Sequence, residues 1–579
     1  MPDPFFATNK TRKRKRAAPS EKGGPKKGTG RPNGKPQAFG KSAPPTKKSK
    51  RDEELSDETS DEGDGGVDDM DLRAPDVDPD AYESGDEDED ETPAEKRLRL
   101  AKLYLENVKQ GLSLADGEFD AAEIDKELIS ARLKQDVLQH SGKVHLFVAD
   151  SYDYSDPPTF RTRGHAFSVT AAVASEDSRW MYTSGKDGCI IKWDLHTGKK
   201  VHKFHKIRPP KVNGKGKGKA RAEPVDLEGH TDEIWALALS PDGRLLASGG
   251  KDRRVGVWDV DKNEWVKDFS GHRDSISALA FRKTSAASTS SAPTQLYTGS
   301  YDRTLKLFDL SPNTMGYVET LFGHQAPVLS LDALMRETAV SVGGRDKSVR
   351  FWKIPEESQL VFRGGGRTGW EDALECGDPS EQMEVDGKKK GKTKERFMEG
   401  SVECVAMVDE TTFLSGGDSG TISLWSTQKK KPIFTQAVAH GMDESHVHTE
   451  DVEIVRKPRW ITALGCLRYS DLFASGSWDG VIRLWKLDAK LRSFSQVGVI
   501  PALGVINSLQ FLSIPQSQLS GFTWVESHSN GEDASTPNKT SSILVAGVGQ
   551  EMRLGRWIQK KGEGVLNGAL VIALSMRTP

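Results

Sequence analysis

The sequence predicts an all-β fold, a seven-bladed β-propeller that follows a short helical segment and a disordered, charged N-terminal tail. Three observations lead to this prediction. A strand-forming phrase recurs seven times between residues 141 and 579, apolar residues recur at helical spacing within 92–140, and residues 1–91 are divided into a basic and an acidic block. We therefore expect three regions: a tail over 1–91, a helical segment over 92–140 and a propeller over 141–579.

The repeated phrase fixes the number of blades. Each copy places a turn with Gly and Asp before a short strand that ends at an aromatic residue, and a Gly–His pair precedes four of the copies. This is the WD-repeat pattern, so the prediction is a seven-bladed WD40 β-propeller in which each copy forms one four-stranded blade. The last copy is degenerate. The seven phrases span 184–194, 248–259, 298–309, 342–353, 415–426, 475–486 and 547–557.

Ser or Thr, His, Asp and Trp recur with the phrase and resemble the parts of a hydrolase site. A single active site would not recur in several blades, so we interpret these residues as buried hydrogen-bonded tetrads that hold the blades together. No Gly-rich phosphate loop stands between a strand and a helix, and the sequence predicts neither an enzyme nor a cofactor. The two clearest tetrads are His165, Thr183, Asp187 and Trp193, and His230, Ser248, Asp252 and Trp258.

Composition excludes several other classes of protein. Hydrophobic residues make up 35% of the chain, charged residues 29%, and no apolar run reaches the roughly 20 residues that cross a bilayer. The four cysteines are scattered, which argues against a disulfide framework or a Cys-based zinc site and predicts a reducing, intracellular compartment. His440, His446 and His448 lie close together, but carboxylates surround them, and we predict no metal site.

The tail has strongly segregated charge. Residues 1–51 contain 16 Lys and Arg against two acidic residues, whereas 52–91 contain 21 Asp and Glu against one Arg. Such blocks cannot bury enough apolar surface to fold, so we expect disorder. The basic clusters predict nuclear import or a nucleic-acid arm, and a merely solvated tail is the alternative. The import residues are Arg12, Lys13, Arg14, Lys15, Arg16, Lys47, Lys48, Lys50 and Arg51.

Two amphipathic helices are expected before the propeller. The first begins at a capping box, Thr92 to Glu95, and continues with an apolar stripe from Leu98 to Leu112. The second covers 119–139. The pattern alone leaves two alternatives open, packing on the neighbouring domain and docking to a partner.

The Gly–His loops and the Asp turns share one rim of a WD-repeat propeller, called here the top face. The residue before each turn Asp faces that rim, and several such residues are basic or aromatic, a combination suited to phosphates and unstacked bases. An ordinary protein-binding rim is the alternative. Insertions at 207–223, 364–399 and 437–458 are expected on the same face, and insertions at 284–294 and 514–541, as disordered padding, on the opposite one.

Five phrases, some of them outside the repeat pattern, span 95–106, 271–282, 317–325, 352–362 and 547–557. They resemble one nucleolar family, the U3 small nucleolar RNA-interacting WD-repeat proteins. The resemblance covers about 93–579 and implies a non-catalytic subunit of the U3 ribonucleoprotein. Such a subunit binds the box B/C element of U3 small nucleolar RNA in the nucleolus, beside a kink-turn-binding core protein and other small-subunit processome proteins, and acts in precursor ribosomal RNA processing.

The rim and this resemblance together give the candidate RNA-binding residues. Arg273 and Arg553 are added to the rim residues on the basis of their position. A nuclear protein scaffold without RNA binding, of the histone-binding or ubiquitin-ligase receptor type, is the competing hypothesis. The candidates are Lys186, Lys251, Arg273, Tyr301, Arg345, Trp478, Gln550 and Arg553.

Overall fold

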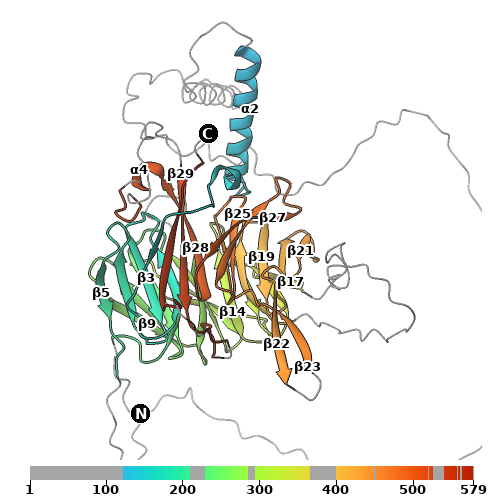
Figure 1. The fold of residues 1–579 in the computed structure, drawn as a ribbon. Coiled ribbons are helices and arrows are strands. Elements are labelled where there is room, and N and C mark those ends of the chain that lie inside the picture. Colours follow the sequence, from blue (N-terminus) through green and yellow to red (C-terminus); the bar gives the residue numbers. More distant parts are fainter. Residues whose placement is uncertain are drawn as a thin grey trace, which may run out of the picture. The chain divides into compact units, whose positions relative to one another are not determined.

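A computed structural model shows a ring of β-sheets with a helix attached to one side (Figure 1). The strands of its described residues form seven four-stranded sheets and one two-stranded hairpin, as the repeats predict. The tail, the first predicted helix and most of the predicted insertions lie outside the described residues. These are 121–208, 228–283, 294–364, 400–448, 452–519, 521–525, 540–556, 558–560, 562 and 564–577.

Six blades consist of four consecutive antiparallel strands, with the first strand innermost. Blades 1 to 3 are β2 (Val169–Ala174), β3 (Trp180–Gly185), β4 (Ile190–Asp194) and β5 (Lys200–Phe204); β6 (Ile234–Leu239), β7 (Leu245–Gly250), β8 (Arg254–Asp259) and β9 (Glu264–Ser270); and β10 (Ile276–Phe281), β11 (Gln295–Ser300), β12 (Thr304–Asp309) and β13 (Gly316–Phe322). Blades 4 to 6 are β14 (Val328–Ala333), β15 (Thr338–Gly343), β16 (Ser348–Lys353) and β17 (Ser358–Arg363); β18 (Val402–Met407), β19 (Thr412–Gly417), β20 (Ile422–Ser426) and β21 (Phe434–Gln436); and β24 (Ala463–Cys466), β25 (Leu472–Gly476), β26 (Val481–Leu487) and β27 (Phe494–Pro501).

The seventh blade closes the ring with strands from both ends of the propeller. Its strands are β28 (Val505–Pro515), β29 (Thr540–Gly549), β30 (Gly568–Leu574) and β1 (Thr159–Arg161), and β1 pairs antiparallel with β30 as the outermost strand. Pairing the first strand with the last closes the ring of blades without a break. The prediction that 547–557 forms a turn and strand is wrong. The chain leaves the sheet at Gly549 and returns at Gly568.

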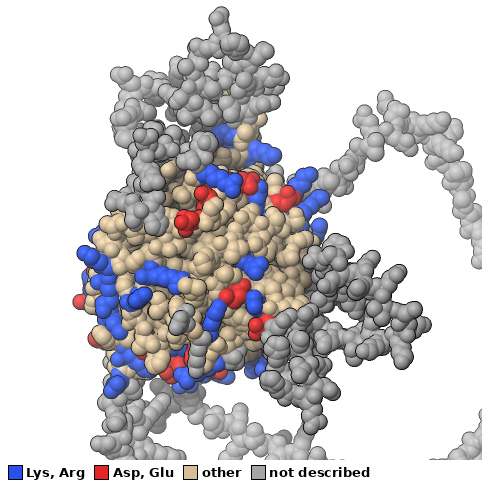
Figure 2. Space-filling view, in the orientation of Figure 1, with Lys and Arg blue, Asp and Glu red and all other residues tan. Residues whose placement is uncertain are grey.

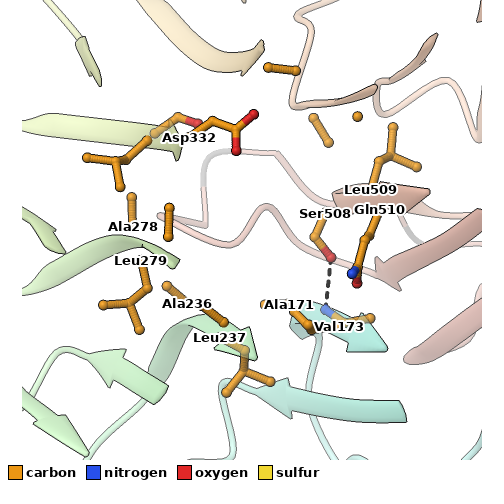
Figure 3. Close-up of a pocket in the computed structure, with 18 of the residues that line it drawn as sticks. Ala171, Val173, Ala236, Leu237, Ala278, Leu279, Asp332, Ser508, Leu509 and Gln510 are labelled. Carbon is orange, nitrogen blue, oxygen red and sulfur yellow. Dashed lines mark hydrogen bonds between the residues drawn. The ribbon is translucent and has the colours of Figure 1, made fainter. Parts of the chain in front are cut away.

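Small residues on the innermost strands let the seven blades converge on a central channel. Ala171, Ala236 and Ala278 line a cavity of about 250 Å³ there, together with Ser508 and Gln510 (Figure 3). Ser508 and Gln510 accept hydrogen bonds from the backbone N–H groups of blade 1, which ties the closing blade to its neighbour. Larger side chains such as Leu246, Phe351 and Trp425 fill the spaces between the blades farther out.

The second predicted helix is confirmed as α2 (Ala121–His140), and the chain after it crosses the bottom face of the propeller. Gly142 has a φ of 67° and packs against Glu410, whose carboxylate accepts hydrogen bonds from the backbone N–H groups of Met335 and Arg336. The N–H groups of His145 and Leu146 donate to Tyr469 O. The end of α2 is therefore fixed to blades 4 to 6.

One insertion differs from its prediction, and another lies on the face that the sequence predicts. Residues 514–525 are not padding: β28 continues to Pro515, α4 (Gln516–Leu519) follows, and Phe522 is buried in the core between blades 7 and 1. The insertion at 437–458 forms a hairpin, β22 (Met442–His448) and β23 (Val452–Pro458), on the side opposite α2 (Figure 1). His440 precedes this hairpin and belongs to the tetrad of blade 6.

Candidate nucleic-acid interface

Hydrogen-bonded tetrads tie the loops of the top face together. His230 Nδ1 lies 2.7 Å from Asp252 Oδ2 and Nε2 lies 2.6 Å from Ser248 Oγ, which also accepts from Trp258 Nε1. Burial favours a raised pKa for Asp252, but hydrogen bonds from His230 and the backbone outweigh it, and the pKa is lowered. Because five blades contain this arrangement, it is a structural element and not an active site. The other four are His165, Thr183, Asp187 and Trp193; His272, Thr298 and Asp302, where Phe308 replaces the Trp; His324, Ser341, Asp346 and Trp352; and His440, Ser475, Asp479 and Trp485.

Removing one tetrad carboxylate should cost stability. We expect Asp252→Ala to lower the free energy of unfolding by about 1–3 kcal/mol, because His230 and the N–H of Thr231 lose their buried acceptor. Urea denaturation followed by tryptophan fluorescence measures this change, with Glu264→Ala, on an exposed outer strand, as the control. A variant of normal stability that no longer binds RNA would show that Asp252 acts in binding.

Two of the predicted RNA-binding cations point into the protein. Lys186 Nζ lies 3.0 Å from Glu551 Oε2 and donates to Gly555 O, and the side chain is only 5% exposed. The Arg553 guanidinium donates to Ser277 O at 2.7 Å and to Leu329 O at 2.6 Å, on the innermost strands of blades 3 and 4. Burial lowers the pKa of Arg553. These contacts do not support phosphate binding by either side chain.

The residues after β29 form a loop that covers the top of the channel, called here the channel loop (550–556 and 558–560). Tyr301 packs with Trp235 and with Leu554 of this loop, and its ring centroid is 5.4 Å from that of Trp235. Trp478 packs with Trp460 and with the loop residues Met552 and Ile558.

The predicted rim residue Gln550 is exposed at the start of this loop, and its side-chain amide donates to Val565 O. Five predicted RNA-binding residues thus belong to the channel loop or hold it in place. They are Lys186, Tyr301, Trp478, Gln550 and Arg553.

The three other predicted residues are exposed and come from adjacent blades. Lys251 and Arg345 precede the turn Asp of blades 2 and 4, and Arg273 follows the tetrad His of blade 3. The backbone N–H of Arg273 donates to Asp302, and its side chain is exposed. The structure therefore keeps these cations available on one side of the ring.

The sequence analysis missed three further cations, which directly follow the turn Asp of blades 2, 3 and 4. Arg253, Arg303 and Lys347 have φ values of 65°, 71° and 52°, in the left-handed region. Blades 1, 5 and 6 have glycine at this position. The left-handed conformation costs a residue with a Cβ about 1–2 kcal/mol, and such strain is concentrated at functional sites. The repeat phrases already contain this information, because their turns have Arg, Arg and Lys at the position where the other turns have Gly.

These six cations form one surface, called here the cationic arc: Lys251, Arg253, Arg273, Arg303, Arg345 and Lys347. Among the residues that the structure describes, none of the six forms a salt bridge, whereas Asp252, Asp302 and Asp346 beside them are engaged by the tetrad histidines. Basic side chains continue along the outer edge of the propeller over β5 and β9 (Figure 2), where Lys200 and Lys267 are exposed. Blades 2 to 4 thus offer a site for a polyanion.

Other kinds of site are missing from the described part of the chain. It contains no group of three His, Cys, Asp or Glu residues that could hold a metal ion, and its cysteines Cys189, Cys404 and Cys466 are free. No helix in these ranges is long and apolar enough to cross a membrane.

Comparisons with known proteins identify the family. The family described as "WD domain, G-beta repeat" matches 157–194, 223–259, 263–309, 316–353 and 455–486. The chain is 33% identical to ribosomal RNA-processing protein 9 of Saccharomyces cerevisiae, over 89% of this chain and 94% of that protein. It is 33% identical to U3 small nucleolar RNA-interacting protein 2 of Homo sapiens, over 81% of this chain and 80% of the relative. The chain belongs to the U3 small nucleolar RNA-interacting WD-repeat family.

A solved structure agrees with this assignment. The structure of U3-55K has a TM-score of 0.53 with 32% identity, and the match covers 72% of this chain and all of that one. The relatives carry names that describe ribosomal RNA processing or interaction with U3 RNA, and none describes catalysis. The chain is a WD-repeat member of this family.

Proposed function

We propose that this protein is the propeller subunit of a U3 small nucleolar ribonucleoprotein and acts in precursor ribosomal RNA processing in small-subunit biogenesis. Membership of the U3 small nucleolar RNA-interacting family carries this proposal. Its RNA ligand is the box B/C element of U3 RNA. The kink-turn-binding core protein and other small-subunit processome proteins are its protein partners, and it needs no cofactor.

The cationic arc is the part of the propeller that we assign to this RNA. Guanidinium groups make paired hydrogen bonds to phosphate, and exposed cations gain further binding free energy from the counterions that the RNA releases. Four of the six residues are arginines, and three adjacent blades present them on one face. The cations lie on rigid turns, because hydrogen bonds from the tetrad histidines hold the neighbouring turn Asp residues in place.

Crosslinking tests the proposal in cells. We would irradiate cells that express the tagged full-length protein, purify it under denaturing conditions and sequence the attached RNA. The proposal requires crosslinks concentrated in the box B/C region of U3 RNA. A protein that copurifies with histones or a ubiquitin ligase and carries no U3 crosslinks would support the scaffold hypothesis instead.

The same proposal places the protein in the nucleolus. The tail lies outside the described residues, and its import role rests on the 16 basic residues within 1–51. We expect deletion of 1–51 to shift the protein toward the cytoplasm while the propeller stays folded, as fluorescence microscopy and circular dichroism would show. Deletion of the acidic block 52–91 is the control. Unchanged nucleolar accumulation after deletion of 1–51 would show that partners carry the propeller in.

A further inference from the structure

Phe322 is an exposed aromatic residue at the top end of blade 3. Its exposed fraction of 70% is higher than that of Val266, Tyr317 or Val318, the other exposed large hydrophobic residues of blades 2 and 3. It is the last residue of β13, and the tetrad His324 follows two positions later. A single exposed apolar residue is common on protein surfaces, so the neighbours of this ring decide whether it can serve a ligand.

The surroundings of Phe322 are cationic. Phe322 pairs with Thr304 across β12 and β13, and Thr304 directly follows Arg303 of the cationic arc. On the side of blade 4, the Arg350 guanidinium lies against Gly323, close enough that a Cβ there would come within 2.5 Å of Nη1. The position equivalent to Phe322 is the exposed Arg363 in blade 4. The Phe322 ring therefore lies beside basic residues, on the outermost strand of blade 3.

We propose that Phe322 is a stacking platform for one unpaired base of the bound RNA. This inference rests on the proposed function and adds a second kind of contact to it. A nucleotide has a charged phosphate beside an apolar, flat base, and proteins that bind single-stranded RNA place aromatic rings beside basic residues for this reason. The arc binds the phosphates, and the neighbouring ring covers the base. Phenylalanine has no hydrogen-bonding group, so the contact accepts any of the four bases.

Positive charge around the ring decides between RNA and a protein partner. An apolar protein side chain would cover Phe322 equally well, but its docking would leave the exposed Arg303 beside it without an anion. RNA provides both a base for the ring and a phosphate for Arg303. A protein contact is therefore an outcome of the experiment that would overturn the proposal.

The experiment measures equilibrium binding of the full-length protein, with the kink-turn-binding core protein present, to box B/C RNA at several salt concentrations. Phe322→Ala should weaken binding by about 5- to 100-fold without changing the slope of affinity against salt, because stacking releases no counterions. Phe322→Tyr keeps an aromatic ring at this position, so it should bind as tightly as the unmodified protein. Val318→Ala, which shortens another exposed residue of β13, should bind as the unmodified protein does.

The outcomes separate this proposal from the proposed function. Failure of the unmodified protein to bind box B/C RNA would overturn the proposed function and this inference with it. Salt-dependent binding that Phe322→Ala changes by less than twofold would overturn only the stacking contact. Normal RNA binding by Phe322→Ala combined with loss of processome proteins from the purified particle would assign the ring to a protein partner.

Discussion

Replacing Arg253, Arg303 and Lys347 together with glycine should weaken binding to box B/C RNA by about 10- to 100-fold at physiological salt. Each residue supplies one charge of the cationic arc, and each phosphate contact contributes about 0.7–0.9 to the slope of log affinity against log salt. We therefore expect the slope to fall by about 2–3. Titrations of labelled RNA at four or five salt concentrations would measure affinity and slope together.

The same variant should be at least as stable as the unmodified protein. All three residues adopt the left-handed conformation, which glycine adopts without a steric penalty. Glycine also makes the unfolded chain more flexible, which offsets part of the gain, so we expect a net increase of up to about 1 kcal/mol per site. Weaker binding by a protein of equal or higher stability would separate a role in binding from a role in folding.

Lys429, Lys430 and Lys431 provide a matched control. These three exposed lysines lie in the turn between β20 and β21, which is on the bottom face, and their replacement with glycine changes the net charge by the same amount. This control should keep nearly all of the affinity, because charges farther than a Debye length from the RNA are screened. An equal loss of binding in both variants would show that the RNA responds to total charge and not to the arc.

Local sequence patterns were sufficient to predict the blades but not how the ring closes. Six repeats contain a turn and a strand that ends at Trp or Phe, and each forms the expected sheet. In the seventh, the phrase 547–557 resembles the others, but among the described residues between Gly549 and Gly568 only an isolated bridge between Glu551 and Gln559 forms, and no strand. The strand β1 has three residues and no repeat motif, so it is recognised only by its pairing with β30 in the structure.

The site was harder to predict than the fold because burial depends on long-range contacts. The turn position identified Lys186 as readily as Lys251, yet the carbonyl and carboxylate that hold Lys186 come from a loop more than 360 residues away. His440 lacked its usual neighbours in sequence, since a hairpin separates it from its blade. Arg253 and Arg303 could have been found from the repeat alone, by asking which turns lack the glycine that their geometry favours.

Arg553→Met should destabilise the propeller by about 3 kcal/mol, a large effect for one residue. The guanidinium donates to the carbonyls of Ser277 and Leu329, and loss of two charge-assisted hydrogen bonds leaves both acceptors in the channel without that donor. Methionine keeps much of the length and apolar stem of the side chain, so the change isolates the charged group. Urea denaturation would measure the loss.

Arg556→Met is the control for this prediction, because Arg556 belongs to the same loop but its side chain is 73% exposed and lies 3.8 Å from Glu551. An exposed ion pair of this kind contributes less than about 1 kcal/mol, and we expect little change in stability. Binding of box B/C RNA by folded Arg553→Met should keep the salt slope of the unmodified protein, since this guanidinium binds backbone carbonyls. A stable Arg553→Met protein with a reduced slope would mean that Arg553 leaves the channel and contacts phosphate when RNA binds.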